Sequence, residues 1–176
     1  MMILFLLLFK SGVSYAALPI AQEYQVKAVF LYQFANFVRW PNLAFATSHA
    51  SFNICILGKD PFREELDITI ENEKVEGHLV QVQRLSDMVN IDICQILFIS
   101  QSEEKYLIDI LAYLQQRPVL TVSDIDNFVI QGGMIQFFKR GKRIRFSIDP
   151  KTVKEADLYI SGNLLRIARI IRRPYR

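Results

Sequence analysis

The sequence predicts a single α/β domain in which a mostly parallel sheet carries helices on both faces and an antiparallel hairpin at its edge. Helix-like and strand-like segments alternate through most of the 176-residue chain. Several of the strand-like runs are almost continuously apolar, as strands covered on both faces require. Two strand-like runs that flank Arg140-Gly141-Lys142 then break the alternation and indicate a hairpin. No repeat or linker divides the chain, so we expect three layers around one core.

The first predicted element is a helix within residues 26–41. Its polar side chains fall into an arc about 100° wide, and its apolar side chains cover roughly 200° on the other side. One sheet surface cannot cover so wide an apolar face, so we expect the helix to pack on two neighbours. The helix must end at or before Trp40, because Pro41 disfavours helical geometry in the residue before it. Lys27 falls inside the apolar arc, so its ammonium group either extends to solvent or pairs with a buried carboxylate or bound anion.

A strand, a short helix and a second strand are expected next. A strand is predicted over residues 52–57, which include the apolar run 54–57. Asp60 and Pro61 then suit the cap and the first position of a helix that ends near residue 68. After a polar turn, residues 79–84 alternate in part between apolar and polar side chains, which indicates the second strand.

The rest of the predicted sheet begins with the almost continuously apolar run 95–99. Ser100 and Glu103 form the pattern of a capping box, so we expect a helix over residues 101–116. The remaining predicted elements are a strand over 119–122, the hairpin strands 134–139 and 143–148, a short helix after Pro150 and a last helix from Asn163 to about Arg173.

Residues 1–16 are interpreted as a signal peptide. An uninterrupted apolar run over residues 3–9 is followed by Ser14-Tyr15-Ala16, whose small residues suit cleavage after Ala16. The usual positive charge ahead of the apolar run is missing, and a buried first strand or helix is the alternative. No apolar run reaches the roughly 18–20 residues that a membrane span needs. We therefore expect an exported mature domain over residues 17–176.

The two cysteines, Cys55 and Cys94, lie within or beside apolar strands. An even count in an exported chain favours a disulfide, and two buried free thiols are the alternative. Closing the loop between them would stabilise the fold by about 3.9 kcal/mol in the chain-entropy model. A zinc site is not expected, because the chain has no CxxC motif and only two histidines, His49 and His78. No metal or other cofactor is predicted.

Charge is distributed unevenly along the chain. Residues 139–176 carry twelve Lys and Arg against three Asp and Glu, whereas residues 17–138 carry eight against fifteen. In the predicted last helix, Arg166, Arg169 and Arg173 recur at spacings of three and four residues and would form a basic stripe. Such a stripe is either a solvated face or a surface for an acidic protein partner or an anionic membrane. Nucleic acid is not expected as a partner of an exported protein.

The sequence contains no GxGxxG, GxxxxGK[ST], GxSxG or HExxH motif, so we expect a non-enzymatic protein. Loops 58–60, 100–102 and 123–124 follow predicted parallel strands, where ligands bind in such sheets, but their small and acidic residues equally suit helix caps.

In the predicted hairpin, Met134 follows two glycines, and the adjacent rings of Phe137 and Phe138 point to opposite faces of the strand. One of these rings is expected to be exposed, so the hairpin is the expected interaction edge.

Six sequence blocks carry a resemblance to a known family. They are VKAVFLYQFANFVRWP (26–41), NICILGKDPF (53–62), CQILFISQSEE (94–104), RPVLTVSD (117–124), GGMIQFF (132–138) and RIRFSID (143–149). Through these blocks the chain resembles the YfiR-like family of small periplasmic regulators over nearly all of residues 24–171. The family pairs the cysteines that stand at the positions of Cys55 and Cys94, so the resemblance implies a disulfide between them.

The resemblance also implies a function. YfiR-like proteins bind the periplasmic part of an inner-membrane diguanylate cyclase and hold it inactive. Cyclic-di-GMP, and with it biofilm formation, rises when an outer-membrane lipoprotein sequesters the repressor or when its disulfides are lost. We therefore expect a periplasmic, redox-sensitive and homodimeric regulator of a diguanylate cyclase or of another membrane sensor protein.

The alternative is a periplasmic module that senses a nucleotide or an amino acid through the strand-end loops and Lys27. It would pass the signal to another membrane protein. The residues expected to contact a partner or ligand under either hypothesis are Lys27, Trp40, Met134, Phe137, Arg166 and Arg169.

Overall fold

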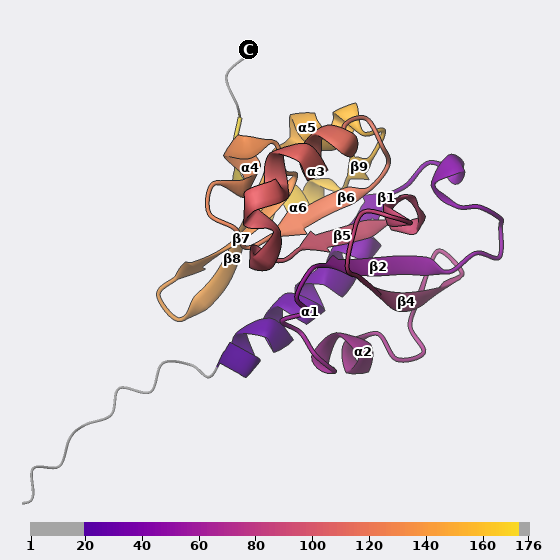
Figure 1. The fold of residues 1–176 in the computed structure, drawn as a ribbon, viewed down its shortest axis with the longest axis horizontal. Helices are drawn as coiled ribbons and strands as arrows, with labels where there is room; N and C mark the ends of the chain where they lie inside the picture. The colour runs from indigo at the N-terminus through magenta and orange to yellow at the C-terminus, as the bar shows by residue number, and fades with distance from the viewer. Residues whose placement is uncertain (1–19, 173–176) are drawn as a thin grey trace, which may run out of the picture.

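The computed structural model describes residues 20–172, in which one large sheet and one small sheet are packed with helices (Figure 1). The predicted signal peptide and Arg173 lie outside these residues. The large sheet consists of β2 (Phe52–Leu57), β3 (Lys74–Val75), β4 (His78–Leu85), β5 (Ile96–Ile99), β6 (Leu120–Ser123), β7 (Ile135–Arg140), β8 (Arg143–Ile148) and β10 (Arg169–Ile170).

The strand order in this sheet is β10-β8-β7-β6-β5-β2-β4-β3. Neighbouring strands are parallel except in the β7–β8 hairpin and the β3–β4 pair. The predicted mostly parallel α/β fold is therefore confirmed. The hairpin lies next to one edge of the sheet, where the two-residue strand β10 pairs with the outer side of β8.

Helix α1 (Ile20–Phe37) crosses one face of the sheet and ends before Trp40, as predicted. Its buried face is narrower than the apolar arc of the sequence, because Val26 remains 44% exposed. Val29, a large apolar residue that lies outside that arc, is 49% exposed. Phe34 lies at the centre of the buried face, with its ring centroid 5.7 Å from that of Phe137 and 5.1 Å from that of Phe146. Besides the sheet, α1 packs on α2 (Glu65–Thr69), so the expectation of two neighbours is confirmed.

The apolar interior is divided by the sheet into two clusters. The larger cluster lies between the sheet and α1, α2, α5 (Pro150–Glu155) and α6 (Gly162–Ile167). The smaller cluster lies on the opposite face, where α3 (Leu107–Tyr113) and α4 (Phe128–Gln131) pack against the sheet. Helices α1 and α3 therefore lie on opposite sides of the sheet (Figure 1), which gives the three layers that the sequence predicts.

The helix predicted after Asp60 begins later than expected. The Asp60 carboxylate accepts hydrogen bonds from the backbone N–H groups of Phe62 and Arg63, as a cap does. Arg63, however, has a positive φ of 55°, which a continuous helix cannot contain. The first turn is therefore separate from α2, which starts at Glu65.

The capping box predicted at Ser100 does not form. The Ser100 hydroxyl donates to the carbonyl oxygen of Lys59 over 2.7 Å, so it does not cap its own helix. The segment begins as a 3₁₀ helix over Gln101–Tyr106 and becomes α-helical only in α3. The α-helical part of the predicted helix over residues 101–116 is thus less than half as long as expected.

The last helix is also shorter than predicted. Helix α6 ends at Ile167, and the chain then extends into β10. The Ile171 N–H donates to the carbonyl oxygen of Ile148 over 2.9 Å, so pairing with β8 competes with helix continuation and prevails. Arg166 and Arg169 consequently lie on different elements, and the predicted stripe is wrong for this pair.

A second, two-stranded sheet was not predicted. It pairs β1 (Val38–Arg39) with β9 (Tyr159–Ile160) in antiparallel orientation, with Arg39 opposite Tyr159. The Ser161 N–H extends the contact by donating to the carbonyl oxygen of Phe37 over 2.9 Å. This small sheet joins the segment that follows α1 to the segment that precedes α6.

Candidate functional site

The carboxyl ends of β2 and β5 are the first place where a ligand would be expected. The connections that follow these neighbouring strands lead to opposite faces of the sheet, and parallel sheets bind ligands at such points. Here the two loops are bonded to each other, because the Lys59 N–H donates to Ser102 Oγ over 2.9 Å. A Cβ on Gly58 would come within 2.4 Å of that same oxygen. The loops therefore close on each other at the place where a ligand would bind.

The carboxyl end of β6 contains a buried charged cluster. Lys27 is 2% exposed. Its Nζ lies 2.6 Å from Asp124 Oδ2, directly after β6, and 2.6 Å from Glu23 Oε1 on α1. The Tyr24 hydroxyl donates to the same Asp124 oxygen over 2.9 Å, and Lys27 Nζ lies 4.2 Å from the centroid of the Tyr24 ring. The Lys27 ammonium group therefore pairs with carboxylates and does not extend to solvent.

Charge within this cluster is closely balanced. Lys139 of β7 forms an ion pair with the second carboxylate oxygen of Glu23. Burial alone would raise the pKa of Glu23, but the ammonium groups of Lys139 and Lys27 hold that pKa below its ordinary value. Burial, together with the negative charge of Asp124, raises the pKa of the Tyr24 hydroxyl, so this hydroxyl stays protonated and donates its hydrogen. With its cations already engaged, the cluster offers little to an anionic ligand.

One oxygen of the cluster has no hydrogen-bond partner among the described residues. Asp124 Oδ1 is buried and accepts no hydrogen bond from any of residues 20–172. A buried acceptor without a donor raises the free energy of the folded state. The carboxylate is nevertheless held in place by Lys27 and Tyr24 through its other oxygen.

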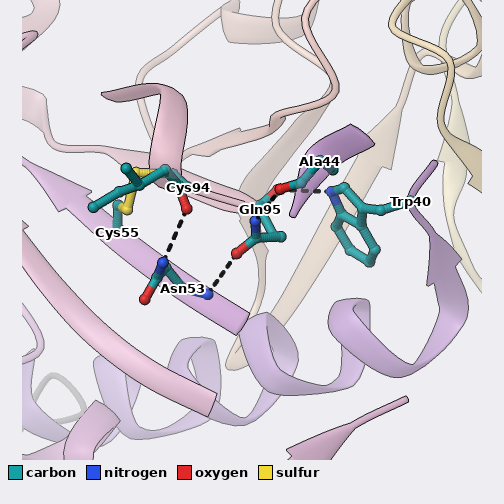
Figure 2. The surroundings of a disulfide bond; sticks show 7 residues. Trp40, Ala44, Asn53, Cys55, Cys94 and Gln95 are labelled. Carbon is teal, nitrogen blue, oxygen red and sulfur yellow. Dashed lines mark hydrogen bonds between the residues drawn. A yellow bond between two sulfur atoms is a disulfide. The ribbon is translucent and has the colours of Figure 1, made fainter. Parts of the chain in front are cut away.

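The two cysteines form a disulfide that joins Cys55 of β2 to Cys94, which lies two residues before β5. The Cα atoms of Cys55 and Cys94 lie 5.8 Å apart. Hydrogen bonds surround the bridge (Figure 2): the Asn53 N–H donates to Gln95 Oε1 over 2.6 Å, and Trp40 Nε1 donates to the Gln95 carbonyl oxygen over 3.0 Å. The disulfide and these hydrogen bonds connect β2, the residues just before β5, and Trp40, which follows α1 and β1.

An open cavity of about 820 Å³ lies between the end of α1, the small sheet and α6. Arg39 and Tyr159 contribute from the two paired strands, and Arg166 contributes from α6. Neither guanidinium group forms an ion pair with any of the residues 20–172, and no acidic residue lines the cavity. The other residues of the lining are Asn36, Phe37, Ser161, Gly162 and Asn163.

The six residues expected to contact a partner or ligand divide into buried and exposed groups. Trp40 packs with its ring centroid 4.9 Å from that of Phe52. Arg166 is exposed and lines the cavity, whereas Arg169 is exposed but its guanidinium group lies over the Phe138 ring, 5.9 Å from its centroid. The buried residues of the set are Lys27, Trp40, Met134 and Phe137.

Two cavity residues, Arg39 and Tyr159, were missed in the sequence. Both belong to two-residue strands, which are too short to show an alternating pattern. The sequence offered one signal for Arg39, which is its position near the predicted end of the first helix, just before Trp40-Pro41. A charged side chain at the end of a helix can point away from the core. Nothing in the sequence marks Tyr159.

A family model described as YfiR/HmsC-like matches residues 24–169 of the chain. The match includes both cysteines, the buried charged cluster from Tyr24 onward and the two arginines of the cavity. A comparison with curated proteins finds no match. Within residues 20–172, no helix combines the length and the apolar character that crossing a bilayer requires.

Proposed function

Because the chain belongs to the YfiR/HmsC-like family, we propose that it is a non-enzymatic periplasmic protein that binds and inhibits the periplasmic part of a membrane diguanylate cyclase. The family match over residues 24–169 carries this proposal. YfiR-like proteins are regulators of a diguanylate cyclase, and the chain has the disulfide that the resemblance implies. Inhibition lowers the cellular concentration of cyclic-di-GMP.

The mechanism is a shift in the population of two cyclase states. A regulator inhibits only if it binds the inactive state more tightly than the active one. Each tenfold preference for the inactive state corresponds to about 1.4 kcal/mol of free energy. The protein needs no catalytic group for this role, because differential binding alone moves the equilibrium.

The geometry of the strand ends favours a protein partner over a small ligand. The loops after β2 and β5 are bonded to each other, and the Lys27 ammonium group is held by two carboxylates. The alternative hypothesis, a sensor of a nucleotide or amino acid, needs these loops and the Lys27 ammonium group to contact the ligand. Both are already engaged in contacts within the protein. Calorimetry against a panel of such metabolites tests the alternative, which requires saturable binding that Lys27→Ala abolishes.

The disulfide makes the regulator sensitive to redox conditions. Cys55 lies in the middle of the sheet, on a strand paired on both sides by β4 and β5. In the chain-entropy model, the bridge stabilises the fold by about 4 kcal/mol, which is a large part of the 5–15 kcal/mol typical of a domain. A reducing periplasm therefore lowers the amount of folded regulator and releases the cyclase.

The regulator acts as a homodimer and has a second partner, an outer-membrane lipoprotein that sequesters it. The dimer is supported by apolar side chains that stay exposed on two helices packed on each other: Val26 and Val29 on α1, and Ile68 on α2. Apolar side chains that gather on one surface mark an interaction site more often than isolated ones do.

Deletion of the gene tests the proposed function. We expect cyclic-di-GMP and surface attachment to rise severalfold in the deletion strain and to return to the original level when the intact gene is supplied. The same deletion in a strain without the diguanylate cyclase should have no effect. Unchanged cyclic-di-GMP in the first strain would exclude regulation of a cyclase.

A further inference from the structure

Within residues 20–172, two arginines face a cavity without a carboxylate partner. Two exposed arginines elsewhere on the surface are paired: Arg84 forms ion pairs with Asp60 and Asp67, and Arg117 forms one with Asp92. Arg39 and Arg166 form none with any described residue, although both line the same cavity. A guanidinium group is charged at every physiological pH and presents up to five N–H donors. The cavity therefore has donors and positive charge to offer an external acceptor.

The surroundings of these arginines hold them in place. The Ser161 N–H donates to the Phe37 carbonyl oxygen, and Ser161 Oγ accepts from the Asn163 N–H over 3.1 Å. The Arg166 guanidinium group donates to Asn163 Oδ1, which orients it along α6. On the other side, the ladder between β1 and β9 places Arg39 beside Tyr159. The Arg166 guanidinium group is thus oriented before a ligand arrives, which lowers the entropic cost of binding, and the backbone of Arg39 is fixed beside Tyr159.

The residue types and the openness of the cavity indicate which kind of ligand it takes. Tyr159 is 67% exposed, and Arg39 and Asn163 are exposed as well. A pocket for a small molecule usually buries 70–90% of its ligand, which a site with such exposed walls does not. Arginine and tyrosine are the residues that contribute most to protein–protein contacts.

We propose that this cavity, which we call the Arg39–Arg166 cavity, binds an acidic segment of a protein partner through its carboxylates. Guanidinium groups bind carboxylates with two parallel hydrogen bonds, which gives both strength and orientation. The volume of about 820 Å³ accommodates several side chains of an extended peptide. This inference rests on the proposed function only in taking the ligand of the cavity to be a protein. It adds which surface of the regulator binds that protein and which charge on the protein is recognised.

The test uses isotope-labelled protein purified from the periplasm and a heptaglutamate peptide. NMR titration should give saturable shifts at the amides of Phe37, Arg39, Tyr159 and Gly162. The dissociation constant should rise at least tenfold in the Arg39→Gln/Arg166→Gln variant. The charge-matched control, Arg143→Gln/Arg145→Gln, removes two exposed arginines of β8 that do not line the cavity and should change the constant by less than twofold. A heptaglutamine peptide should not bind.

Three outcomes would overturn the proposal. Equal weakening in the variant and the control would mean general attraction to a basic surface. Inorganic phosphate or a short oligonucleotide that binds the cavity when heptaglutamate does not would assign it to another class of ligand. Absence of any shift at these amides would mean that the cavity is not a binding site. If the double variant does not fold, Arg166→Gln, on the exposed side of α6, replaces it.

The outcome is independent of the test of the proposed function. A deletion strain with raised cyclic-di-GMP, together with a cavity that does not bind heptaglutamate, would retain the regulator and discard this surface. Binding of heptaglutamate in a protein whose deletion leaves cyclic-di-GMP unchanged would retain the surface and assign it to a different protein partner.

Discussion

Lys27 and Asp124 form a 2.6 Å ion pair that joins the first helix to the end of β6, although 97 residues separate them in the chain. Their side chains are 3% and 7% exposed, so both charges have left water. The removal of two charges from water costs free energy that the ion pair only partly offsets, and the pair is therefore better suited to fixing a geometry than to adding stability. Here it fixes the rotation of α1 on the sheet.

The first prediction concerns the removal of one member of this pair. Lys27→Met should lower the free energy of unfolding by about 3–5 kcal/mol, because it leaves the Asp124 charge buried without its partner. Urea unfolding measures the change. Lys105→Met, at an exposed lysine, is the matched control and should change the free energy by less than about 0.5 kcal/mol.

A second variant distinguishes the effect of losing the ion pair from the effect of changing the packing around Lys27. Adding Asp124→Asn to Lys27→Met removes the uncompensated charge, and we expect the double variant to be more stable than Lys27→Met alone. A double variant whose loss equals the sum of the two single losses would mean that the two charges are not coupled.

The second prediction is a dependence of stability on acid. The pKa of Glu23 in the folded protein lies below its ordinary value of 4.5, so the unfolded chain binds the proton more readily. The Glu23 carboxylate therefore contributes stability above pH 4.5, and this contribution is lost as the pH falls through the folded-state pKa. The difference in unfolding free energy between the wild type and Glu23→Gln should shrink from pH 7 to pH 3. A constant difference would contradict the ion pairs of Glu23, and Glu104→Gln, at an exposed carboxylate, is the control.

The third prediction concerns the disulfide. The protein purified from the periplasm should show no free thiol under denaturing, non-reducing conditions. Cys94→Ser should lower the melting temperature, with a loss of about 4 kcal/mol in the chain-entropy model. The reduced wild-type protein should melt at nearly the same temperature as the variant. Two titratable thiols in the purified protein would exclude the redox switch and leave the fold unaffected.

The fourth prediction concerns the homodimer. Light scattering at micromolar concentration should give twice the mass of the mature chain. Val29→Lys together with Ile68→Lys should give the monomer mass, because both are exposed apolar side chains on the packed helices α1 and α2. Ile108→Lys, at an equally exposed isoleucine of α3, should leave the dimer intact. A monomer mass for the wild type would contradict the prediction.

The sequence predicted those elements well whose own residues carry a clear signal, such as an apolar run or a proline. The apolar runs located the central strands, and Pro41 located the end of α1. The sequence also marked Lys27 as unusual, because a single cation on an apolar face is visible without a structure. Its partner was not predictable, because Asp124 looks like an ordinary cap residue until the sheet brings it next to α1.

The errors share a physical cause, which is competition from distant parts of the chain. The Ser100 hydroxyl fits a cap, yet it bonds Lys59 in a neighbouring loop. The spacing of Arg166 and Arg169 fits a helix, yet the backbone after Ala168 pairs with β8. The Arg39–Arg166 cavity escaped prediction for the same reason, because its walls come from both ends of the chain.

The pairing of β1 with β9 has a consequence for how the protein matures. Arg39 belongs to an early part of the chain, whereas Tyr159 and Arg166 are synthesised and exported near its end. Contacts between such distant segments require the closure of a long loop, so they form late in folding. A chain cut short before β9, or one still emerging from the export machinery, lacks Tyr159 and Arg166 and so has no Arg39–Arg166 cavity. Recognition at that cavity would therefore be reserved for molecules that have been completed.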